Sequence, residues 1–319
     1  FSSVKVCVIG DLIVDEYITC EPLGMSQEDP TIVVTPIDST SFIGGAGIVA
    51  AHASGLGAKV EFISVVGKDD GRIFASKKLD DFNVKSELIV DKNRPTTVKQ
   101  RFRSKGKTLL RVSHLHQDAI DLQIQDRIFK KVKSVIDKVD LLVFSDFNYG
   151  CLPTSLVDKI SVLAKSKNVL LVADSQSSSQ IGDISRFNGM DLITPTEREA
   201  RISISNNEDG LAVLAKTILE KSLSKNTILK MGEEGVLIYL NDGSDIKGDW
   251  FTDRIPALND SPKDVVGAGD SLLISSALTI VSGGTIWEAA LIGSLAAAIQ
   301  VGRVGNSPLK SEELLENLT

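Results

Sequence analysis

The segment from Asp264 to Asp270, DVVGAGD, contains the residue types best suited to chemistry, and a helix-forming run follows it directly. Gly267, Ala268 and Gly269 precede Asp270 at this helix entry. Glycines there let several backbone N–H groups point to one place, and the helix dipole adds to their attraction for phosphate oxygens. A carboxylate beside such a group can take a proton from a hydroxyl that attacks phosphorus. The segment therefore favours phosphoryl transfer, with simple helix capping as the open alternative.

Two further groups of residues lie where predicted strands end or helices begin. Asp11 directly follows a buried run that ends at Gly10, and Asp15 lies four residues after Asp11. Carboxylates at the ends of strands accept hydrogen bonds from sugar hydroxyls, but Asp11 is equally a common turn former. Gly44 and Gly45 precede a predicted helix, where they permit either close approach of a ligand or ordinary turn geometry. These residues are candidates for a sugar site.

The elements that must position these residues follow an α/β pattern. Buried apolar runs alternate with helix-length segments, which predicts a mostly parallel sheet with helices on both faces. The predicted strands are 4–10, 60–67, 141–146, 168–174 and 191–194, with 226–232 and 235–240 as a further pair, and the predicted helices are 46–56, 71–81, 121–138, 153–165, 208–222, 267–283, 285–302 and 311–318. Ligands of such sheets bind beyond the carboxyl ends of the strands, where the candidate residues lie.

Two stretches interrupt this alternation and predict a small inserted β-flap. Residues 30–38 are typical of a strand, and 95–113 of a hairpin that turns at Lys105-Gly106-Lys107. We call residues 15–41 and 95–113 the flap. Since the chain contains no internal repeat and no low-complexity linker, one domain over 1–319 that carries the flap is predicted.

Composition excludes several classes of protein. With 42% hydrophobic and 24% charged residues, the chain can form a packed core and is not disordered. A net charge of −7 without basic runs argues against nucleic acid or a membrane surface as partner, but not against a small anionic substrate. No apolar run is long enough for a membrane span, and no signal peptide precedes the first predicted strand. The 3 cysteines lack metal-ligand spacing and fit reduced thiols, so a cytoplasmic protein is expected.

The order and spacing of these motifs resemble the ribokinase-like carbohydrate kinases, the pfkB family, over essentially the whole chain. The segments 194–199 (TPTERE) and 229–235 (LKMGEEG) also match in family order. The resemblance implies a ribokinase-like three-layer α/β/α sandwich and an ATP-dependent kinase. It further implies Asp270 as catalytic base, an anion hole at 267–269, Glu199 as an organiser of Mg²⁺ through water, and a monovalent cation as an additional cofactor. The residues that it places at the nucleotide are Lys230, Gly232, Gly235, Asp264 and Ser294.

Within that family the chain is most similar to bacterial heptose-7-phosphate kinases. The similar segments are 8–17 (VIGDLIVDEY), 26–34, 95–99 and 109–112. This resemblance implies that Asp11 and Asp15 orient the sugar and that flap cations hold its distal phosphate, although each cation alone is equally explained as a charge facing water. The cations are Lys99, Arg101, Arg103 and Arg111. A homodimer through the flap is also implied.

The same kinases are often fused to a nucleotidyltransferase, but no His-x-x-His motif of such a partner follows residue 302. Because Phe1 is not methionine, we expect a processed chain or a piece excised from a longer, bifunctional polypeptide.

Several positions depart from the family pattern. The resemblance places asparagine where this chain has Ile48, Thr196 and Ser294, and lysine where it has Tyr149 and Gln176. Ile48 is expected to give the sugar pocket an apolar wall, which predicts a changed sugar. The lost lysines leave a second hypothesis open, a kinase-like protein that binds sugar phosphate or nucleotide without turnover.

Overall fold

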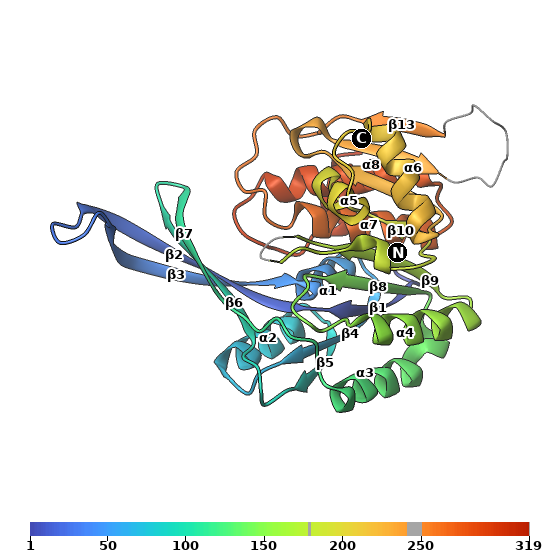
Figure 1. The fold of residues 1–319 in the computed structure, drawn as a ribbon, viewed down its shortest axis with the longest axis horizontal. Helices are drawn as coiled ribbons and strands as arrows, with labels where there is room; N and C mark the ends of the chain where they lie inside the picture. Colours follow the sequence, from blue (N-terminus) through green and yellow to red (C-terminus); the bar gives the residue numbers. More distant parts are fainter. Residues whose placement is uncertain (178–179, 241–250, 319) are drawn as a thin grey trace.

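The computed structural model describes residues 1–177, 180–240 and 251–318, and its main sheet has nine strands in the order β13-β12-β11-β10-β9-β8-β1-β4-β5 (Figure 1). These strands are β1 (Lys5–Gly10), β4 (Lys59–Val66), β5 (Lys85–Val90), β8 (Leu141–Asp146), β9 (Leu170–Ser175), β10 (Leu192–Ile193), β11 (Asn226–Lys230), β12 (Val236–Leu240) and β13 (Thr252–Ile255). Neighbouring strands from β5 to β11 pair in parallel. Strand β12 pairs antiparallel with both of its neighbours, β11 and β13. The predicted, mostly parallel sheet is confirmed.

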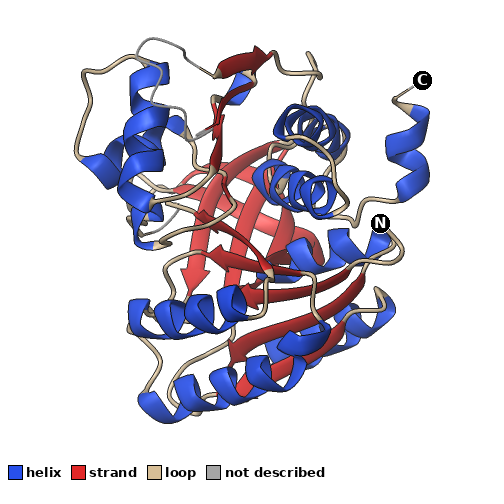
Figure 2. Cartoon of the chain, turned by 90° about the vertical axis from the view of Figure 1, so that its right-hand side faces the viewer, coloured by secondary structure: helices blue, strands red, loops and turns tan. Residues whose placement is uncertain are grey.

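Helices cover both faces of this sheet (Figure 2). They are α1 (Ala46–Gly55), α2 (Asp70–Asp81), α3 (Leu122–Val135), α4 (Thr154–Ser166), α5 (Glu197–Ile204), α6 (Leu211–Ser222), α7 (Ala268–Val281), α8 (Ile286–Val301) and α9 (Ser311–Glu316). Strand β1 joins the two cores, because successive side chains of a strand point to opposite faces. Val6 and Val8 pack with α1, α7 and α8, whereas Cys7 and Ile9 pack with α3, α4 and α6. The structure is thus a three-layer α/β/α sandwich.

The flap residues belong to a separate four-stranded sheet in the order β3-β2-β6-β7. Its strands are β2 (Leu12–Met25), β3 (Ile32–Gly45), β6 (Thr97–Ser104) and β7 (Lys107–His114). The β2–β3 hairpin extends away from the body (Figure 1). The turn between β6 and β7 is one residue shorter than expected: Lys105 (φ 46°) and Gly106 (φ 80°) form it, and Lys107 already pairs with Ser104. Positive φ at both positions matches the twist of the flanking strands.

Some elements differ from those that the sequence predicts. Strands β2, β5 and β13 and helix α5 are additional. Helix α5 begins after Thr196, whose side chain accepts from the Glu199 N–H while the Glu199 carboxylate accepts from the Thr196 N–H. This capping box has a recognisable Thr-x-x-Glu spacing, which is a signal for the helix. Pro153 lies at the N-cap of α4 rather than in its first turn, and α6 begins only after Gly210.

We expect the flap to exchange its amide hydrogens faster than β9 in the absence of ligand. Most residues of β3 and β7 are exposed, whereas β9 is buried between two helical layers. A sheet with little buried apolar surface opens locally at low free-energy cost. Hydrogen exchange followed by mass spectrometry measures this directly. Equal protection of the flap and of residues 168–174 in the ligand-free protein would contradict the prediction.

Candidate active site

Asp270 lies in the first turn of α7, at the positive end of this helix. The helix begins after Gly267, whose φ of 82° is left-handed, and the Asp270 side chain is buried. The first N–H groups of an α-helix have no acceptor within the helix, so an anion can use them. The Ala268 N–H makes only a long contact, 3.4 Å to the Val265 carbonyl oxygen. The expected anion hole, which is half-buried, and the buried candidate base therefore lie together at one helix end.

The surroundings of Asp270 suit a proton acceptor. Burial and the charge of Asp174 raise the pKa of Asp270 to about 7, Asp15 adds to the rise, and Lys230 opposes it. Gln176, just beyond β9, donates a hydrogen bond from Nε2 to Asp270 Oδ1 at 2.8 Å. A general base works best when its pKa is near the working pH. Nothing in the local sequence of Gln176 signals this contact, because the two residues are 94 positions apart.

Asp174, near the end of β9, and Lys230, the last residue of β11, form a buried ion pair. The Lys230 Nζ lies 3.1 Å from Asp174 Oδ1 and 3.0 Å from Oδ2. Burial raises the pKa of Asp174 to about 6, although Lys230 opposes this change. A Cβ atom on Gly269 would lie 3.1 Å from the same Nζ. The ammonium group thus lies directly beside the expected anion hole.

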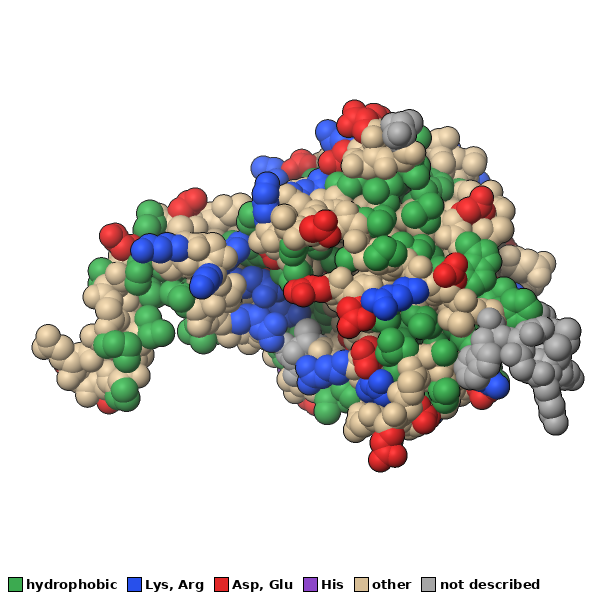
Figure 3. Space-filling model, turned by 90° about the horizontal axis from the view of Figure 1, so that it is seen from above, with side chains coloured by type: hydrophobic (Ala, Val, Ile, Leu, Met, Phe, Trp, Pro, Cys, Tyr) green, Lys and Arg blue, Asp and Glu red, His purple; other side chains and the backbone are tan. Residues whose placement is uncertain are grey.

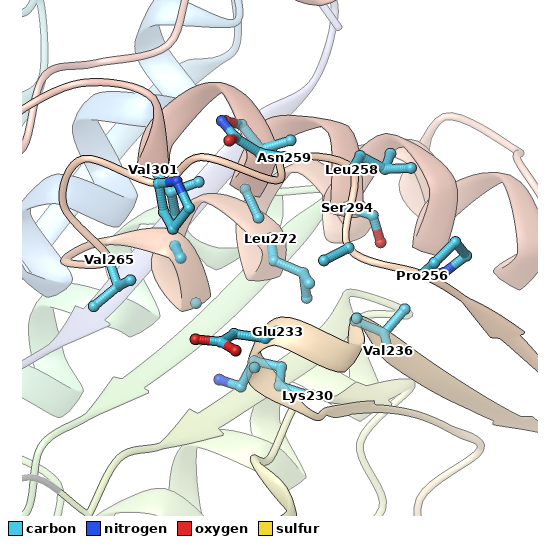
Figure 4. Close-up of a pocket in the computed structure, with 18 of the residues that line it drawn as sticks. Lys230, Glu233, Val236, Pro256, Leu258, Asn259, Val265, Leu272, Ser294 and Val301 are labelled. Carbon is cyan, nitrogen blue, oxygen red and sulfur yellow. The ribbon is translucent and has the colours of Figure 1, made fainter.

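A hollow of about 450 Å³ starts at Lys230 and continues between the β11–β12 turn and helices α7 and α8 (Figure 4). Its lining is mostly apolar, as is usual for small-molecule sites, and includes Val236, Pro256, Leu258, Leu272 and Val301. Among the residues expected at the nucleotide, Lys230, Gly232, Gly235 and Ser294 line it. The Ser294 Oγ is buried and has no hydrogen-bond partner in the described part of the chain.

Asp264 was also expected at the nucleotide, but it does not line this hollow. Its Oδ2 accepts hydrogen bonds from the Tyr17 hydroxyl at 2.8 Å and from the Gly305 N–H at 3.1 Å. Its Oδ1 accepts from the Val266 N–H at 3.2 Å. The carboxylate therefore joins the flap to the loop before α7. Both oxygens thus accept hydrogen bonds from the protein, and the expected contact of Asp264 with the nucleotide stays a prediction.

Asp15 lies on the flap side of Asp270. It is buried, and its Oδ1 accepts a hydrogen bond from Arg101 at 3.2 Å. Burial raises the pKa of Asp15 even though Arg101 and Lys99 oppose the change. A Cβ atom on Gly44 would lie 2.2 Å from Asp15 Oδ2, so only glycine lets this carboxylate approach the backbone there. Gly45, with φ 59°, is the N-cap of α1.

Asp11, the second expected sugar ligand, is occupied by the protein itself. Its Oδ2 accepts from the Phe147 N–H at 2.8 Å and the Tyr149 N–H at 3.3 Å, and its Oδ1 accepts from the Cys151 N–H at 3.2 Å. Burial and the charge of Asp146 raise the pKa of Asp11 to about 6. Asp11 therefore fixes the loop after β8, and its expected hydrogen bond to a sugar stays a prediction.

The flap cations named from the sequence gather on one face of the four-stranded sheet, near Asp15. Arg101 and Arg103 both lie over the Tyr17 ring, with guanidinium-to-centroid distances of 5.8 Å and 4.8 Å. Arg111 pairs opposite Arg101 in the β6–β7 register and therefore shares its face. Figure 3 shows Lys and Arg side chains gathered where the flap meets the body.

Lys99 belongs to the same strand but is buried. Its Nζ lies 5.1 Å from the centroids of both the Phe147 and the Tyr149 rings. Tyr149, one of the departures from the family pattern, thus contacts from the loop after β8 a lysine of the flap. Cation–π contacts of this kind stabilise a desolvated ammonium group.

Arg103 also lines a hollow of about 250 Å³ between the flap and Val304. Tyr17, Phe42 and Lys105 contribute to the same lining. The sequence predicts Lys105 only as a turn residue and does not predict that it lines this hollow. The signal for it is that Lys105 continues the spacing of Arg101 and Arg103 by one step, just beyond the end of β6.

Ile48 does not form the expected apolar wall of a sugar pocket. Its side chain is 0% exposed and packs in the core that α1 shares with α7 and β1. The wall was expected from a position in the family pattern, but the packing of α1 turns this side chain inward. A change of sugar therefore cannot be argued from residue 48.

Glu199 is surrounded by donors from the protein. Its Oε2 accepts from the Thr196 N–H and its Oε1 from the Ser177 N–H, both at 2.8 Å. Over the residues that the structure describes, no three His, Cys, Asp or Glu side chains cluster as metal ligands would. Each oxygen of Glu199 thus already accepts one backbone hydrogen bond, which is compatible with the water-mediated role that the resemblance implies.

Comparison with known proteins places this geometry in a family. The chain matches the model of the pfkB family carbohydrate kinases over residues 3–312. It therefore belongs to the pfkB family and is a carbohydrate kinase. The bifunctional protein HldE of Helicobacter hepaticus is 31% identical over 98% of this chain and 64% of its own length. That of Campylobacter fetus is 30% identical over 99% of this chain and 66% of its own length. The chain thus spans about two thirds of these relatives.

Solved structures show the same fold. Phosphofructokinase-2 from Escherichia coli in complex with potassium aligns with a TM-score of 0.77 and 15% identity, covering 99% of this chain and 98% of that one. Arabidopsis thaliana ribokinase complexed with ribose and ATP aligns with a TM-score of 0.74 and 16% identity, covering 100% and 99%. The fold is therefore ribokinase-like.

Proposed function

We propose that this kinase transfers the γ-phosphoryl group of ATP to a hydroxyl of a sugar phosphate, with heptose phosphates as the favoured class. The position of Asp270 carries the proposal. The charges of Lys230, where the hollow starts, and of Asp15, which pairs with the flap cation Arg101, both act on the carboxylate of Asp270. A base between a nucleotide and an acceptor hydroxyl is the arrangement that phosphoryl transfer requires.

In the proposed step, Asp270 takes the proton of the acceptor hydroxyl while its oxygen bonds to the γ-phosphorus. The bond between that phosphorus and the bridging oxygen breaks, and ADP leaves with the electron pair. The N–H groups of Gly267, Ala268 and Gly269 receive the negative charge on the transferred group. Asp15 orients the sugar by accepting a hydrogen bond from a second hydroxyl.

The proposal includes Mg²⁺ and a monovalent cation. Mg²⁺ supplies positive charge to the nucleotide phosphates, and it commonly keeps several water ligands. The described residues are compatible with that mode of binding, since Glu199 offers a carboxylate whose oxygens each accept only one backbone hydrogen bond. The Escherichia coli relative in complex with potassium supports the monovalent cation, for which we assign no residues.

A phosphorylated acceptor is supported by the cations near Asp15. Arg101 and Arg103 present guanidinium groups, which match phosphate oxygens, on the face that lies toward the site. Arg103 is the one that also lines the 250 Å³ hollow, together with Lys105. We therefore place the distal phosphate at that hollow.

The function is tested by measuring conversion of ATP to ADP over a panel of sugars and sugar phosphates that includes heptose 7-phosphates. Mass spectrometry of the products identifies the acceptor. Faster turnover of phosphorylated acceptors supports the proposal. Binding of ATP or of a sugar phosphate without turnover of any acceptor would replace it with the non-catalytic, regulatory alternative.

Arg103→Met is expected to raise KM for the sugar phosphate at least tenfold, because a hydrogen bond to a charged group contributes ~1.5–3 kcal/mol. KM for the unphosphorylated sugar should stay within about twofold. Initial rates with both acceptors at saturating ATP measure this. Lys107→Met is the matched control, since Lys107 is exposed on the same hairpin and does not line the hollow. Equal changes for both acceptors would show that Arg103 only supports Tyr17 and Asp264, whose Oδ2 lies 3.9 Å from Arg103 Nη1.

The setting of the enzyme completes the proposal. Leu23, Met25 and Ile37 are more than 60% exposed on the flap, which supports a homodimer through this sheet.

The longer, bifunctional relatives support a second domain in the native polypeptide. We place the reaction in the cytoplasm, where ATP is available and free thiols such as those of the three cysteines persist. In the described part of the chain, the helices are too short or too polar to span a membrane.

A further inference from the structure

The hollow proposed for the nucleotide has a particular balance of charge. Among the described residues that line it, Lys230 is the only lysine or arginine, whereas Glu233 and Asp260 contribute carboxylates. A nucleoside triphosphate carries several negative charges, which need positive partners in a partly buried site. Lys230 is therefore the side chain in this hollow that can meet the phosphate chain with opposite charge.

The position of Lys230 is fixed on two sides. Its Nζ contacts both carboxylate oxygens of Asp174 at 3.0 and 3.1 Å, and it lies beside the Cα of Gly269 in the expected anion hole. The side chain is 12% exposed, so it is nearly buried and still open to the hollow. Figure 4 shows it on the wall opposite Asn259 and Val301.

Lys230 keeps its charge in this position. Burial acts to lower the pKa of Lys230, but the charges of Asp174, Glu199 and Asp270 outweigh burial and raise it. An ammonium group has three N–H donors, and two of those of Lys230 point to the carboxylate oxygens of Asp174. The remaining donor is available to a phosphate oxygen, which a compact ammonium charge binds well.

We propose that Lys230 is a catalytic residue that binds and neutralises the γ-phosphoryl group during transfer, and that Asp174 is the positioning residue that holds its ammonium beside Gly269. The inference rests on the proposed function. Gln176, which contacts Asp270, is a neutral amide. The positive charge beside Asp270 is therefore supplied by Lys230, the last residue of β11.

The competing explanation is that the ion pair only joins β9 to β11. Replacing Lys230 alone leaves the Asp174 carboxylate buried without its partner, which destabilises a protein strongly. The informative variant therefore removes both charges, as Lys230→Met/Asp174→Asn. Lys230→Arg keeps the charge. Lys225→Met is the matched control, because Lys225 directly precedes β11 and pairs with Asp191 at the surface.

The first measurement is calorimetric titration of each variant with ADP and with the non-hydrolysable β,γ-imido analogue of ATP. In the double variant, affinity for the analogue should fall at least tenfold, whereas affinity for ADP should change less than about twofold. Lys225→Met should match the wild type. Equal losses for both nucleotides, or no loss, would overturn the role at the γ-phosphoryl group whether or not an acceptor is known.

The second measurement is steady-state kinetics with the acceptor found in the screen. The double variant should lose about 100-fold in kcat while KM for the sugar phosphate stays within about twofold, and Lys230→Arg should recover part of the rate. An unchanged kcat in an otherwise active enzyme overturns the inference and leaves the proposed function standing. A wild-type protein that turns over no acceptor overturns the proposed function, and the titration still decides the role of Lys230.

Discussion

Replacement of Asp270 with asparagine is expected to lower kcat by about 10²–10⁴-fold, the usual contribution of a positioned general base. The amide is nearly the same size as the carboxylate but cannot accept the proton of the acceptor hydroxyl. The first-turn position tolerates asparagine, and Gln176 can still contact the side-chain oxygen. Initial rates at saturating ATP and acceptor measure the effect, and circular dichroism checks that the variant is folded.

The matched control is Asp70→Asn. Asp70 is an exposed carboxylate in the first turn of α2, so the change repeats the chemistry of the substitution at a helix start away from the site. This control should keep the wild-type rate. A folded Asp270→Asn variant with wild-type kcat would show that another group accepts the proton, and the proposed mechanism would lose its base.

The same residue predicts the pH dependence of the reaction. Its pKa of about 7 is set mainly by burial and by Asp174, whose own pKa is about 6, with a smaller contribution from Asp15 and opposition from Lys230. The base must be deprotonated, so kcat/KM should rise with pH through about 6–7 and level off above. Because Asp174 and Asp270 interact, the apparent value belongs to the pair. The residual activity of Asp270→Asn should lack this rise.

The parts of this protein that were predictable from its sequence depend on local signals. The strand runs are continuous because both faces of the sheet are covered, and β1, with Val6 and Cys7 in different cores, is the clearest example. The proposed anion hole and base are contiguous from Gly267 to Asp270, so their relation needs no tertiary information. The same holds for the capping box that begins α5.

The parts that were not predictable depend on contacts between distant segments. Asp11 is occupied by N–H groups that lie 136 to 140 positions away, which no pattern around Asp11 reveals. Asp264 contacts Tyr17 from 247 positions away. Ile48 stands where the family pattern has a polar residue. Whether its side chain faces a pocket depends on how α1 packs against α7 and β1, and here it lies in the core between them. Sequence patterns therefore predicted which segments carry the candidate reacting groups and left open which carboxylates already accept hydrogen bonds from the protein.

The second large effect is expected for Gly267→Ala, which should lower kcat by about 10²–10³-fold, the usual result of disrupting an oxyanion-hole-type donor. Gly267 has φ 82°, a left-handed conformation that costs other residues ~1–2 kcal/mol. In addition, a Cβ atom there would lie 2.1 Å from Asn306 Oδ1, so the loop or Asn306 must move. Either movement displaces the N–H groups that face the transferred phosphoryl group.

Gly283→Ala separates these two causes. Gly283 follows the other end of α7 with φ 93°, and a Cβ atom there would have no neighbour within 4 Å. The control therefore carries the same backbone penalty without the collision. We expect both variants to lose stability in thermal unfolding, but only Gly267→Ala to lose its rate at saturating substrates. If both variants kept the wild-type kcat, the N–H groups at 267–269 would not stabilise the charge that develops during transfer, and the anion hole would have to be sought elsewhere along the phosphate path.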